Sequence, residues 1–256
     1  MNEAAPPLAY FESTDGQRIA YRLRPRAPGG IEQPTLLFLP GYASDMAGAK
    51  ALALDQLAAA RGVAMLRFDY SGTGESPGSF ADGTLAGWID QAAAAVDRLT
   101  EGPLIVVGSS MGGWIALHLA LRRPDRVAAL VGIAAAPDFT DWGFSPAEKS
   151  ALNRDGLLER PNPYGGEAQR TTRAFLQSGE ALRLLDAPIA VECPVRLVHG
   201  DADADVPIEV AFRLMRGLRS ADVQLTIVKG GGHRLSAPHE IDLIVRTVAA
   251  LLEPAQ

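Results

Sequence analysis

The stretch that most constrains the fold runs from Leu104 to Trp114 and reads LIVVGSSMGGW. Its first residues are apolar and β-branched, as in a buried strand. They lead into Gly-x-Ser-x-Gly at residues 108–112, and an apolar segment with helical spacing follows. This order is typical of a nucleophile elbow, a sharp turn from strand to helix that holds its serine, Ser110, in a strained backbone conformation. Glycine is expected at positions 108 and 112 because side chains there would collide across so tight a turn.

Size and charge narrow the class of protein. The 256 residues are 47% hydrophobic and 21% charged, with a formal charge of -6 and no block of lysines and arginines. Such a chain can build a sizeable core, but it lacks the basic patch that binds nucleic acid or an anionic membrane surface. It also has no apolar run long enough for a membrane span. We therefore expect a globular protein that neither binds nucleic acid nor crosses a membrane.

The cysteine content and the first residues bear on localisation. The single cysteine, Cys193, excludes an intramolecular disulfide and fits a reducing compartment. The opening residues, MNEAAPP, resemble neither a signal peptide nor an arginine-rich transit peptide. These observations predict a cytoplasmic protein, and they leave its oligomeric state open between a monomer and a small homo-oligomer.

Strand and helix patterns alternate along most of the chain. A hairpin is expected first, over residues 8–23, with Asp15-Gly16 as its turn. The expected strands then cover residues 35–39, 63–68, 104–107, 127–133, 195–198 and 223–228, and the expected helices cover 49–61, 85–99, 114–121, 208–218 and 238–252. This alternation predicts an α/β fold, with helices on both faces of a mostly parallel sheet and the antiparallel hairpin at one edge.

The alternation is interrupted between residues 134 and 190. Prolines, glycines, aromatic residues and two short helical patterns, over 146–158 and 170–185, stand where one more helix and strand would be expected. We interpret residues 135–190 as a small helical cap over the carboxyl ends of the strands, inserted into a single domain of residues 1–256. Its aromatic residues either line a pocket for an acyl chain or hold the cap shut. The candidates are Phe139, Trp142, Phe144 and Tyr164, of which we select Trp142 and Phe144 as pocket residues.

A serine hydroxyl becomes a useful nucleophile only with a base within hydrogen-bond reach and an acid that orients the base. Of the four histidines, His118 falls within the helix after the elbow and is expected to be a packed or partly exposed residue of that helix. His199 ends a buried strand and is expected to be a structural or hydrogen-bonding residue, whereas His239 begins the last helix and is expected to be solvated. His233 follows three glycines in a loop, where a flexible backbone can bring its imidazole over the end of the sheet. His233 is therefore the predicted base.

The predicted acid lies in the segment DADADVP at residues 201–207. We select Asp203, with Asp205 and then Asp201 as alternatives, because two residues separate it from the Val-Pro pair at which a helix starts. The other aspartates are expected to cap that helix. The spacing superficially resembles a calcium-binding loop, but the sixth position is Val206 instead of glycine and the twelfth is a phenylalanine instead of glutamate.

The negative oxygen of a tetrahedral intermediate needs hydrogen-bond donors that are already in place. One expected donor is the backbone N–H of Met111, directly after Ser110 and at the start of a helix. The second should come from the loop after the strand that contains Phe38. In that loop, Pro40-Gly41-Tyr42, we select the backbone N–H of Tyr42.

Motifs for cofactors are missing from the sequence. Gly72-Thr73-Gly74 has Pro77 where a dinucleotide-binding fingerprint needs its third glycine, and there is neither a Walker loop nor the cysteine and histidine spacing of a zinc site. The expected chemistry requires no metal and no organic cofactor.

Together these motifs resemble the α/β-hydrolase superfamily over nearly the whole chain. Five segments are more specifically similar to the family of α/β-hydrolase domain-containing protein ten, and they are Pro40–Tyr42, Arg67–Gly72, Gly108–Trp114, Cys193–Gly200 and His233-Arg234. Animal members of that family are mitochondrial serine hydrolases described as palmitoyl-protein thioesterases and acyl-glucuronide esterases. The resemblance implies a nucleophile at Ser110, an acid at Asp203 and a base at His233. No mitochondrial targeting segment is recognisable, which favours a bacterial relative in the cytosol.

The sequence therefore predicts a serine hydrolase that cleaves carboxylic esters or thioesters through an acyl-enzyme. Its expected substrates are small-molecule acyl esters or thioesters, with acylated proteins as a further class. A peptidase or amide hydrolase with the same three residues is the first alternative, and a non-catalytic member that binds a small hydrophobic ligand is the second. Dehalogenases and epoxide hydrolases of this fold carry an aspartate at the elbow, so Ser110 argues against both.

Overall fold

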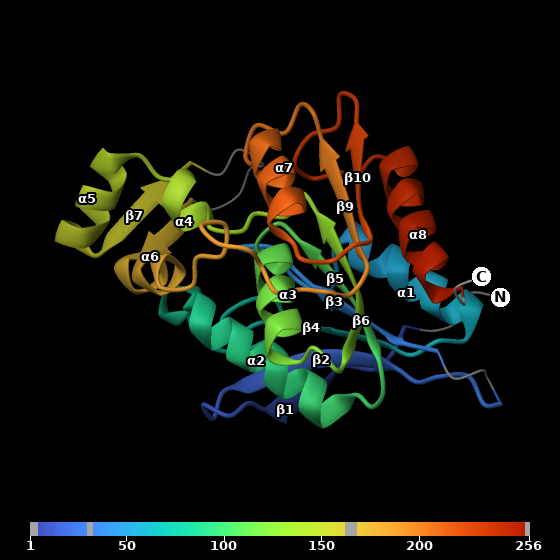
Figure 1. Ribbon diagram of the computed structural model, residues 1–256. Coiled ribbons are helices and arrows are strands. Elements are labelled where there is room, and N and C mark those ends of the chain that lie inside the picture. The colour runs from blue at the N-terminus through green and yellow to red at the C-terminus, as the bar shows by residue number, and fades with distance from the viewer. Residues whose placement is uncertain (1–4, 30–32, 162–167, 254–256) are drawn as a thin grey trace.

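The computed structural model describes residues 5–29, 33–161 and 168–253 (Figure 1). Through its middle runs an eight-stranded sheet of order β1-β2-β4-β3-β5-β6-β9-β10. Its strands are β1 Ala9–Glu12, β2 Arg18–Arg24, β3 Thr35–Leu39, β4 Met65–Phe68, β5 Leu104–Ser109, β6 Val127–Ile133, β9 Val195–Gly200 and β10 Val223–Val228. β2 runs antiparallel to both of its neighbours, and the pairs from β4 to β10 are all parallel. The predicted α/β-hydrolase fold, with an antiparallel hairpin at one edge, is confirmed.

Helices cover both faces of this sheet (Figure 1). One face carries α1 Ala49–Arg61 and α8 Pro238–Leu252, and the other carries α2 Leu85–Leu99, α3 Met111–Arg122 and α7 Ile208–Gly217. Among the helices in the described part of the chain, none combines the length and the apolar character that a bilayer crossing requires.

The central strand β3 explains why the core strands read as continuous apolar runs. All five of its residues are buried. Leu36 and Phe38 pack in the layer of α1 and α8, whereas Leu37 and Leu39 pack in the layer of α2 and α3. Successive side chains of a strand point to opposite faces, so a strand covered on both sides has apolar residues at successive positions, as Leu36–Leu39 do.

Between β6 and β9 the chain builds a separate group of elements at one side of the molecule (Figure 1). These are α4 Phe139–Trp142, α5 Pro146–Asp155, β7 Leu157–Arg160, β8 Gln169–Thr172 and α6 Arg173–Glu180. β7 and β8 form an antiparallel hairpin that was not expected from the sequence. The helix expected over 146–158 ends at Asp155 because Gly156 takes the left-handed conformation, with φ at 83°. The helix expected over 170–185 begins only at Arg173, because Thr172 caps it with its side chain.

Candidate active site

Ser110 lies at the turn between β5 and α3. Its φ of 54° and ψ of -119° are a combination that residues other than glycine rarely adopt. The neighbouring glycines make the turn possible. A Cβ on Gly108 would lie 2.2 Å from the carbonyl oxygen of Gly112, and a Cβ on Gly112 would lie 2.1 Å from the carbonyl oxygen of Leu39 in β3. The expected collisions therefore exist, and the second one is with the adjacent strand instead of with the turn itself.

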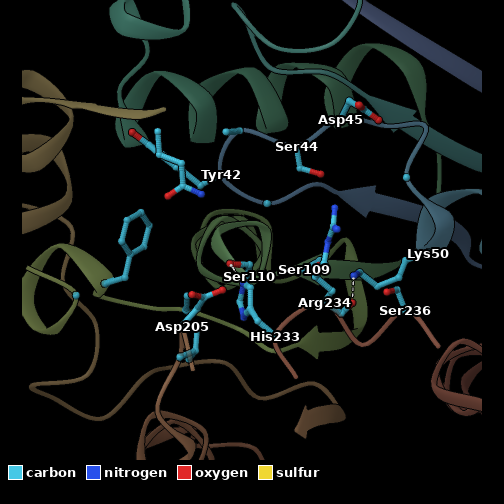
Figure 2. Close-up of a pocket in the computed structure, with 18 of the residues that line it drawn as sticks. Tyr42, Ser44, Asp45, Lys50, Ser109, Ser110, Asp205, His233, Arg234 and Ser236 are labelled. Atoms are coloured by element: carbon cyan, nitrogen blue, oxygen red, sulfur yellow. Dashed lines mark hydrogen bonds between the residues drawn. The ribbon is translucent and has the colours of Figure 1, made fainter. Parts of the chain in front are cut away.

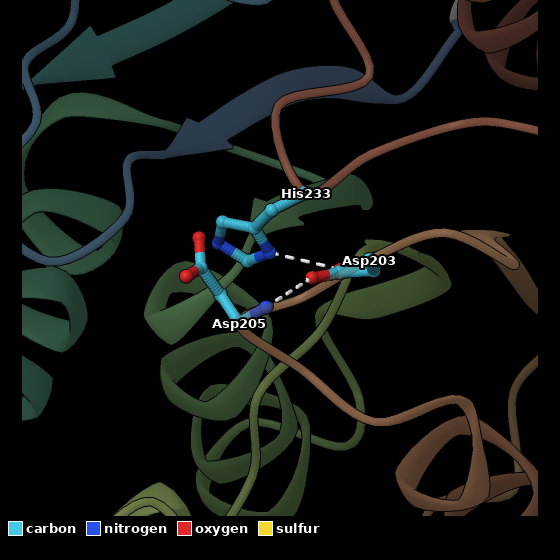
Figure 3. A group of neighbouring side chains, drawn as sticks. All are labelled: Asp203, Asp205 and His233. Carbon is cyan, nitrogen blue, oxygen red and sulfur yellow. Dashed lines mark hydrogen bonds and ion pairs between the residues drawn. The ribbon is translucent and has the colours of Figure 1, made fainter. Parts of the chain in front are cut away.

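The three side chains predicted to act together lie in one row. The Nε2 atom of His233 is 3.0 Å from Ser110 Oγ (Figure 2), and its Nδ1 atom is 2.9 Å from Asp203 Oδ2 (Figure 3). His233 comes from the loop between β10 and α8, and Asp203 from the loop between β9 and α7. We assign the imidazole proton to Nδ1, because Asp203 offers only acceptors when ionised. Nε2 is then free to accept the proton of the Ser110 hydroxyl.

Gly200 and Gly231 allow the loop that carries Asp203 to contact the loop that carries His233. A Cβ on Gly200 would lie 2.0 Å from the carbonyl oxygen of Gly231. The same carbonyl accepts a hydrogen bond of 3.0 Å from the N–H of Ala202. The glycine-rich segment before His233 is therefore packed against the loop of Asp203, so these glycines permit close approach of two backbones.

Asp203 is held as an ionised carboxylate. Its side chain is 0% exposed, and its Oδ1 atom accepts hydrogen bonds of 2.9 Å from the N–H groups of Asp205 and Val206. Burial by itself would raise the pKa of Asp203, but the hydrogen bond and the positive charge of His233 and these backbone donors together lower that pKa below its usual value. An ionised acid at this place stabilises a protonated His233.

The predicted alternatives to this acid occupy other places. Asp201 accepts a hydrogen bond from the N–H of Gly230, and Asp205 lines the cavity beside His233 (Figure 3). The expectation that these aspartates cap the next helix is wrong, because α7 starts after Pro207 without any side-chain cap. The backbone N–H groups of this loop, those of Asp205 and Val206, donate instead to the side chain of Asp203.

One group among the described residues is compact enough to hold a metal ion. Asp203, Asp205 and His233 each offer a ligand atom within 4.8 Å of the others (Figure 3). The direct hydrogen bond between Asp203 and His233 already joins two of these ligands. The arrangement therefore fits a base oriented by its acid better than it fits a metal site.

The remaining histidines match their expected places. His118 is buried in α3, where its Nε2 lies 2.9 Å from the carbonyl oxygen of Leu182, and burial lowers its pKa. His199 is 1% exposed, with its Nε2 2.9 Å from the carbonyl oxygen of Val206. His239 is exposed at the start of α8.

The loop after β3 lies against the serine. A Cβ on Gly41 would be 3.2 Å from the Cβ of Ser110. Tyr42 is the next residue in this loop, and Met111 follows Ser110 as the first residue of α3. The two backbone N–H groups selected as oxyanion donors thus belong to the two segments that border the serine.

The side chain of Tyr42 has a structural role that was not expected from the sequence. Its ring lies among four aromatic rings at centroid distances of 4.8–6.2 Å, which belong to Phe80, Trp88, Phe139 and Phe175. Its hydroxyl donates a hydrogen bond of 2.7 Å to the carbonyl oxygen of Arg170 in β8. Burial raises the pKa of Tyr42 to about 12, so the hydroxyl keeps its proton. Tyr42 therefore connects the loop beside Ser110 to the group of elements between β6 and β9.

A cavity of about 670 Å³ opens in front of Ser110 and His233 (Figure 2). Both predicted pocket residues, Trp142 and Phe144, line it, together with Phe139. Tyr164 lies outside the described residues. The other side of the cavity is polar and was not predicted, because its residues come from two loops and from the first turn of α1, without a common motif. This side includes Ser44, Asp45, Lys50, Arg234 and Ser236 (Figure 2), and further polar residues that line the cavity are Arg160, Gln169, Thr171 and Asp205.

Lys50 has the most altered environment on this polar side. Its Nζ donates a hydrogen bond to the carbonyl oxygen of Arg234. Burial lowers its pKa to about 8, with a further contribution from the positive charge of Arg234. The nearby carboxylate of Glu240 opposes this change.

Comparisons with known proteins agree with this fold. The model of the α/β hydrolase fold family matches residues 34–161. A solved protein from Agrobacterium vitis S4 superimposes with a TM-score of 0.89 at 40% identity, covering 96% of this chain and 100% of that one. The chain is an α/β hydrolase, and it is an enzyme.

More specific relatives define the family within this class. The human mitochondrial palmitoyl-protein thioesterase ABHD10 is 36% identical over 251 residues, which cover 96% of this chain and 80% of that protein. The solved mouse α/β hydrolase domain-containing protein 10 has a TM-score of 0.87 at 34% identity and covers 96% of this chain and 98% of that one. The chain belongs to the ABHD10 family, as its motifs predicted.

The predicted cytoplasmic location is corrected by the same comparison. The ABHD10 relatives from human, cattle and mouse all carry the designation mitochondrial, which contradicts that prediction. The prediction depended on Cys193 and on the composition of the opening residues. A reducing environment is common to both compartments, so a lone cysteine does not separate them.

Proposed function

We propose that this chain is a serine hydrolase that cleaves carboxylic esters or thioesters through an acyl-enzyme. Ser110 is the nucleophile, His233 the general base and acid, and Asp203 the acid that orients His233. The observation that supports this most strongly is the row of two hydrogen bonds, 3.0 Å from Ser110 to His233 and 2.9 Å from His233 to Asp203. Relatives named palmitoyl-protein thioesterase support acyl thioesters as one substrate class.

The first half of the reaction forms the acyl-enzyme. His233 Nε2 accepts the Ser110 proton while Oγ bonds to the acyl carbon, and Asp203 stabilises the resulting imidazolium. The carbonyl oxygen becomes an oxyanion that accepts hydrogen bonds from the N–H groups of Tyr42 and Met111. Each such donor contributes about 3–4 kcal/mol to the stability of the transition state.

The second half releases the acyl group. His233 gives its proton to the leaving thiol or alcohol as the bond to the acyl carbon breaks. A water molecule then attacks the acyl carbon while His233 Nε2 removes its proton, and His233 passes that proton to Ser110 Oγ as the bond between Oγ and the acyl carbon breaks and the acid product leaves.

The two sides of the cavity bind different parts of the substrate. The aromatic side, with Phe139, Trp142 and Phe144, receives the acyl chain, and the polar side, with Lys50 and Arg234, receives the leaving group. We propose that residues 135–190 form a cap on a single domain, because their described elements supply the aromatic side. The tie from Tyr42 to β8 supports this arrangement.

The test replaces the nucleophile. Ser110→Ala should lower kcat/KM on esters and thioesters by more than about 10³-fold and abolish labelling by a serine-directed phosphonate. Ser109→Ala is the matched control, since it removes the neighbouring hydroxyl and should keep the labelling. Substrates should include a matched oxoester, thioester, acyl glucuronide and aminoacyl amide. Fastest turnover of the amide would favour a peptidase, and binding without turnover would favour a non-catalytic member.

A further inference from the structure

Three polar side chains at the end of β4 have no part in the proposed mechanism. Arg67 and Asp69 are each 1% exposed, and Tyr70 is 0% exposed. Burial of a charge or a hydroxyl is costly unless hydrogen bonds or an opposite charge compensate for it. Their partners therefore indicate what these residues hold in place.

The partners lie in the loop after β3, at residues 40–46. Asp69 Oδ1 accepts a hydrogen bond of 2.7 Å from the N–H of Met46, and Arg67 Nη1 donates one of 2.9 Å to the carbonyl oxygen of the same residue. Tyr70 donates a longer bond of 3.4 Å from its hydroxyl to the carbonyl oxygen of Pro40. The loop is thus held at both ends by one short stretch of chain.

The carboxylate of Asp69 is enclosed on its other side. Its Oδ2 accepts a hydrogen bond of 2.8 Å from the N–H of Glu75. Gly74 has a φ of 49°, and a Cβ there would lie only 2.1 Å from Oδ2. The glycine at this position of the rejected dinucleotide pattern therefore makes room for a buried carboxylate.

The guanidinium of Arg67 is neutralised by a carboxylate that lies outside the loop 40–46. Its Nη2 lies 3.5 Å from Asp55 Oδ2, and Asp55 also pairs with Arg24 at 2.8 Å. The hydrogen bond to Met46 is therefore separate from the charge balance of the arginine. Its effect is to fix a peptide group of the loop.

The loop between these two anchors has one tight shape. The N–H of Ser44 donates a hydrogen bond of 3.2 Å to the carbonyl oxygen of Gly41, and Ala43 takes a left-handed φ of 53°. Gly41 lies against Ser110, as described above. A backbone donor for an oxyanion must be correctly placed before the reaction begins, because reorganisation during the step is costly.

We propose that Arg67, Asp69 and Tyr70 are positioning residues that hold the loop 40–46 so that the N–H of Tyr42 faces the developing oxyanion. The inference rests on the proposed function, because it requires an oxyanion beside Ser110. It assigns a role to a motif that the three reacting side chains leave unexplained.

The test compares a 4-nitrophenyl acyl ester with its thionoester, in which sulfur replaces the carbonyl oxygen. Backbone N–H groups stabilise a negative oxygen better than a larger, softer sulfur. The ratio of kcat/KM on the oxoester to kcat/KM on the thionoester therefore reports how well the oxyanion donors are placed. Asp69→Asn retains the size of the side chain and loses one acceptor for a backbone N–H. We expect kcat on the oxoester to fall at least about tenfold with KM nearly constant, and the ratio to fall with it.

Two further variants make the result decisive. Tyr70→Phe removes only the bond to Pro40 and should lower the ratio by about threefold, which also covers the case in which Asp69→Asn does not fold. Ser76→Ala is the matched control. It removes a buried hydroxyl that bonds the carbonyl oxygen of Asp69 at 2.7 Å and the N–H of Ala20 at 2.8 Å, away from the loop 40–46. Its ratio should equal that of the wild type.

Equal losses on the oxoester and the thionoester would overturn the inference, as would a similar fall of the ratio in Ser76→Ala. The proposed function fails separately. Retained hydrolysis in Ser110→Ala would contradict the nucleophile, whereas an inactive Ser110→Ala with an unchanged ratio in Asp69→Asn and Tyr70→Phe would contradict only the positioning role.

Discussion

At the scale of single residues, the site depends on how each reacting side chain is held. Ser110 is fixed by a backbone turn that two glycines make possible. His233 has a ring held at both nitrogen atoms, and Asp203 is fixed by two backbone N–H groups in addition to His233. The carboxylate therefore has partners for both of its oxygens, and its replacement affects stability as well as catalysis.

Asp203→Asn should lower kcat by about 10⁴-fold, since the amide favours the wrong tautomer of His233. The pKa of Asp203 is below its ordinary value of 3.8, so the ionised side chain stabilises the folded state above that pH. This contribution is lost as the pH falls through the lower folded-state pKa. The melting temperatures of wild type and variant should therefore differ most above pH 3.8, and this difference should shrink as the pH falls below that value. A constant difference between the two proteins at all pH values would contradict the ionised role.

At the scale of elements, the strands could be predicted because burial on both faces leaves a simple signal. β3, β6 and β10, and the helices α1, α2 and α8, have the bounds expected from their sequence patterns. The hairpin β7–β8 could not be predicted in this way, because its half-exposed strands carry charged residues such as Arg160 and Arg170. The local pattern contains too few apolar positions to indicate an alternation.

In the candidate site, too, the features with a local sequence pattern could be predicted and the features that depend on distant contacts could not. Ser110, Asp203 and His233 stand at strand ends, where a short motif gives their position. The polar side of the cavity and the role of the Tyr42 ring could not be predicted, because their partners lie far away along the chain, as with the bond from Tyr42 to Arg170, 128 residues away. Contacts of that kind depend on the packing of whole elements and leave no local pattern.

The turn from β5 to α3 allows a prediction at the scale of elements. Gly108→Ala should destabilise the protein by at least about 3 kcal/mol or prevent folding, because the added Cβ meets a backbone carbonyl of α3 that cannot move aside. Gly217→Ala is the matched control. A Cβ there meets nothing closer than 3.8 Å, so the change should be neutral or slightly stabilising at the end of α7. Denaturant unfolding measures both, and equal effects would contradict the steric account of the elbow.

At the scale of the whole molecule, the cavity is lined both by the loops at the ends of the sheet strands and by the elements between β6 and β9. The three side chains proposed to react come from the turn and loops that follow β5, β9 and β10, and the aromatic side of the cavity comes from residues 139–144. The lengths of acyl chain that the enzyme accepts should therefore depend on that segment, while the chemical step should not.

Phe144→Ala tests this division. It should raise KM for long-chain 4-nitrophenyl esters by about tenfold or more through loss of buried apolar contact, and leave kcat/KM for the acetate ester almost unchanged. Leu157→Ala provides the control, since Leu157 lies on β7 with 42% of its surface exposed and does not line the cavity. A similar loss on short and long chains in Phe144→Ala would show that the residue supports the site in general and does not bind the acyl chain.

The order of the strands has a further consequence for the relation between the sheet and the elements between β6 and β9. β6 and β9 are hydrogen-bonded neighbours, so the excursion of some sixty residues between them departs from the sheet and rejoins it at a single place. A relative can lengthen, shorten or exchange that excursion without breaking any pairing of the sheet. We therefore expect substrate preference to change with that excursion while the sheet is conserved, provided that the contact of Tyr42 with β8 is kept, because Tyr42 lies in the loop beside Ser110.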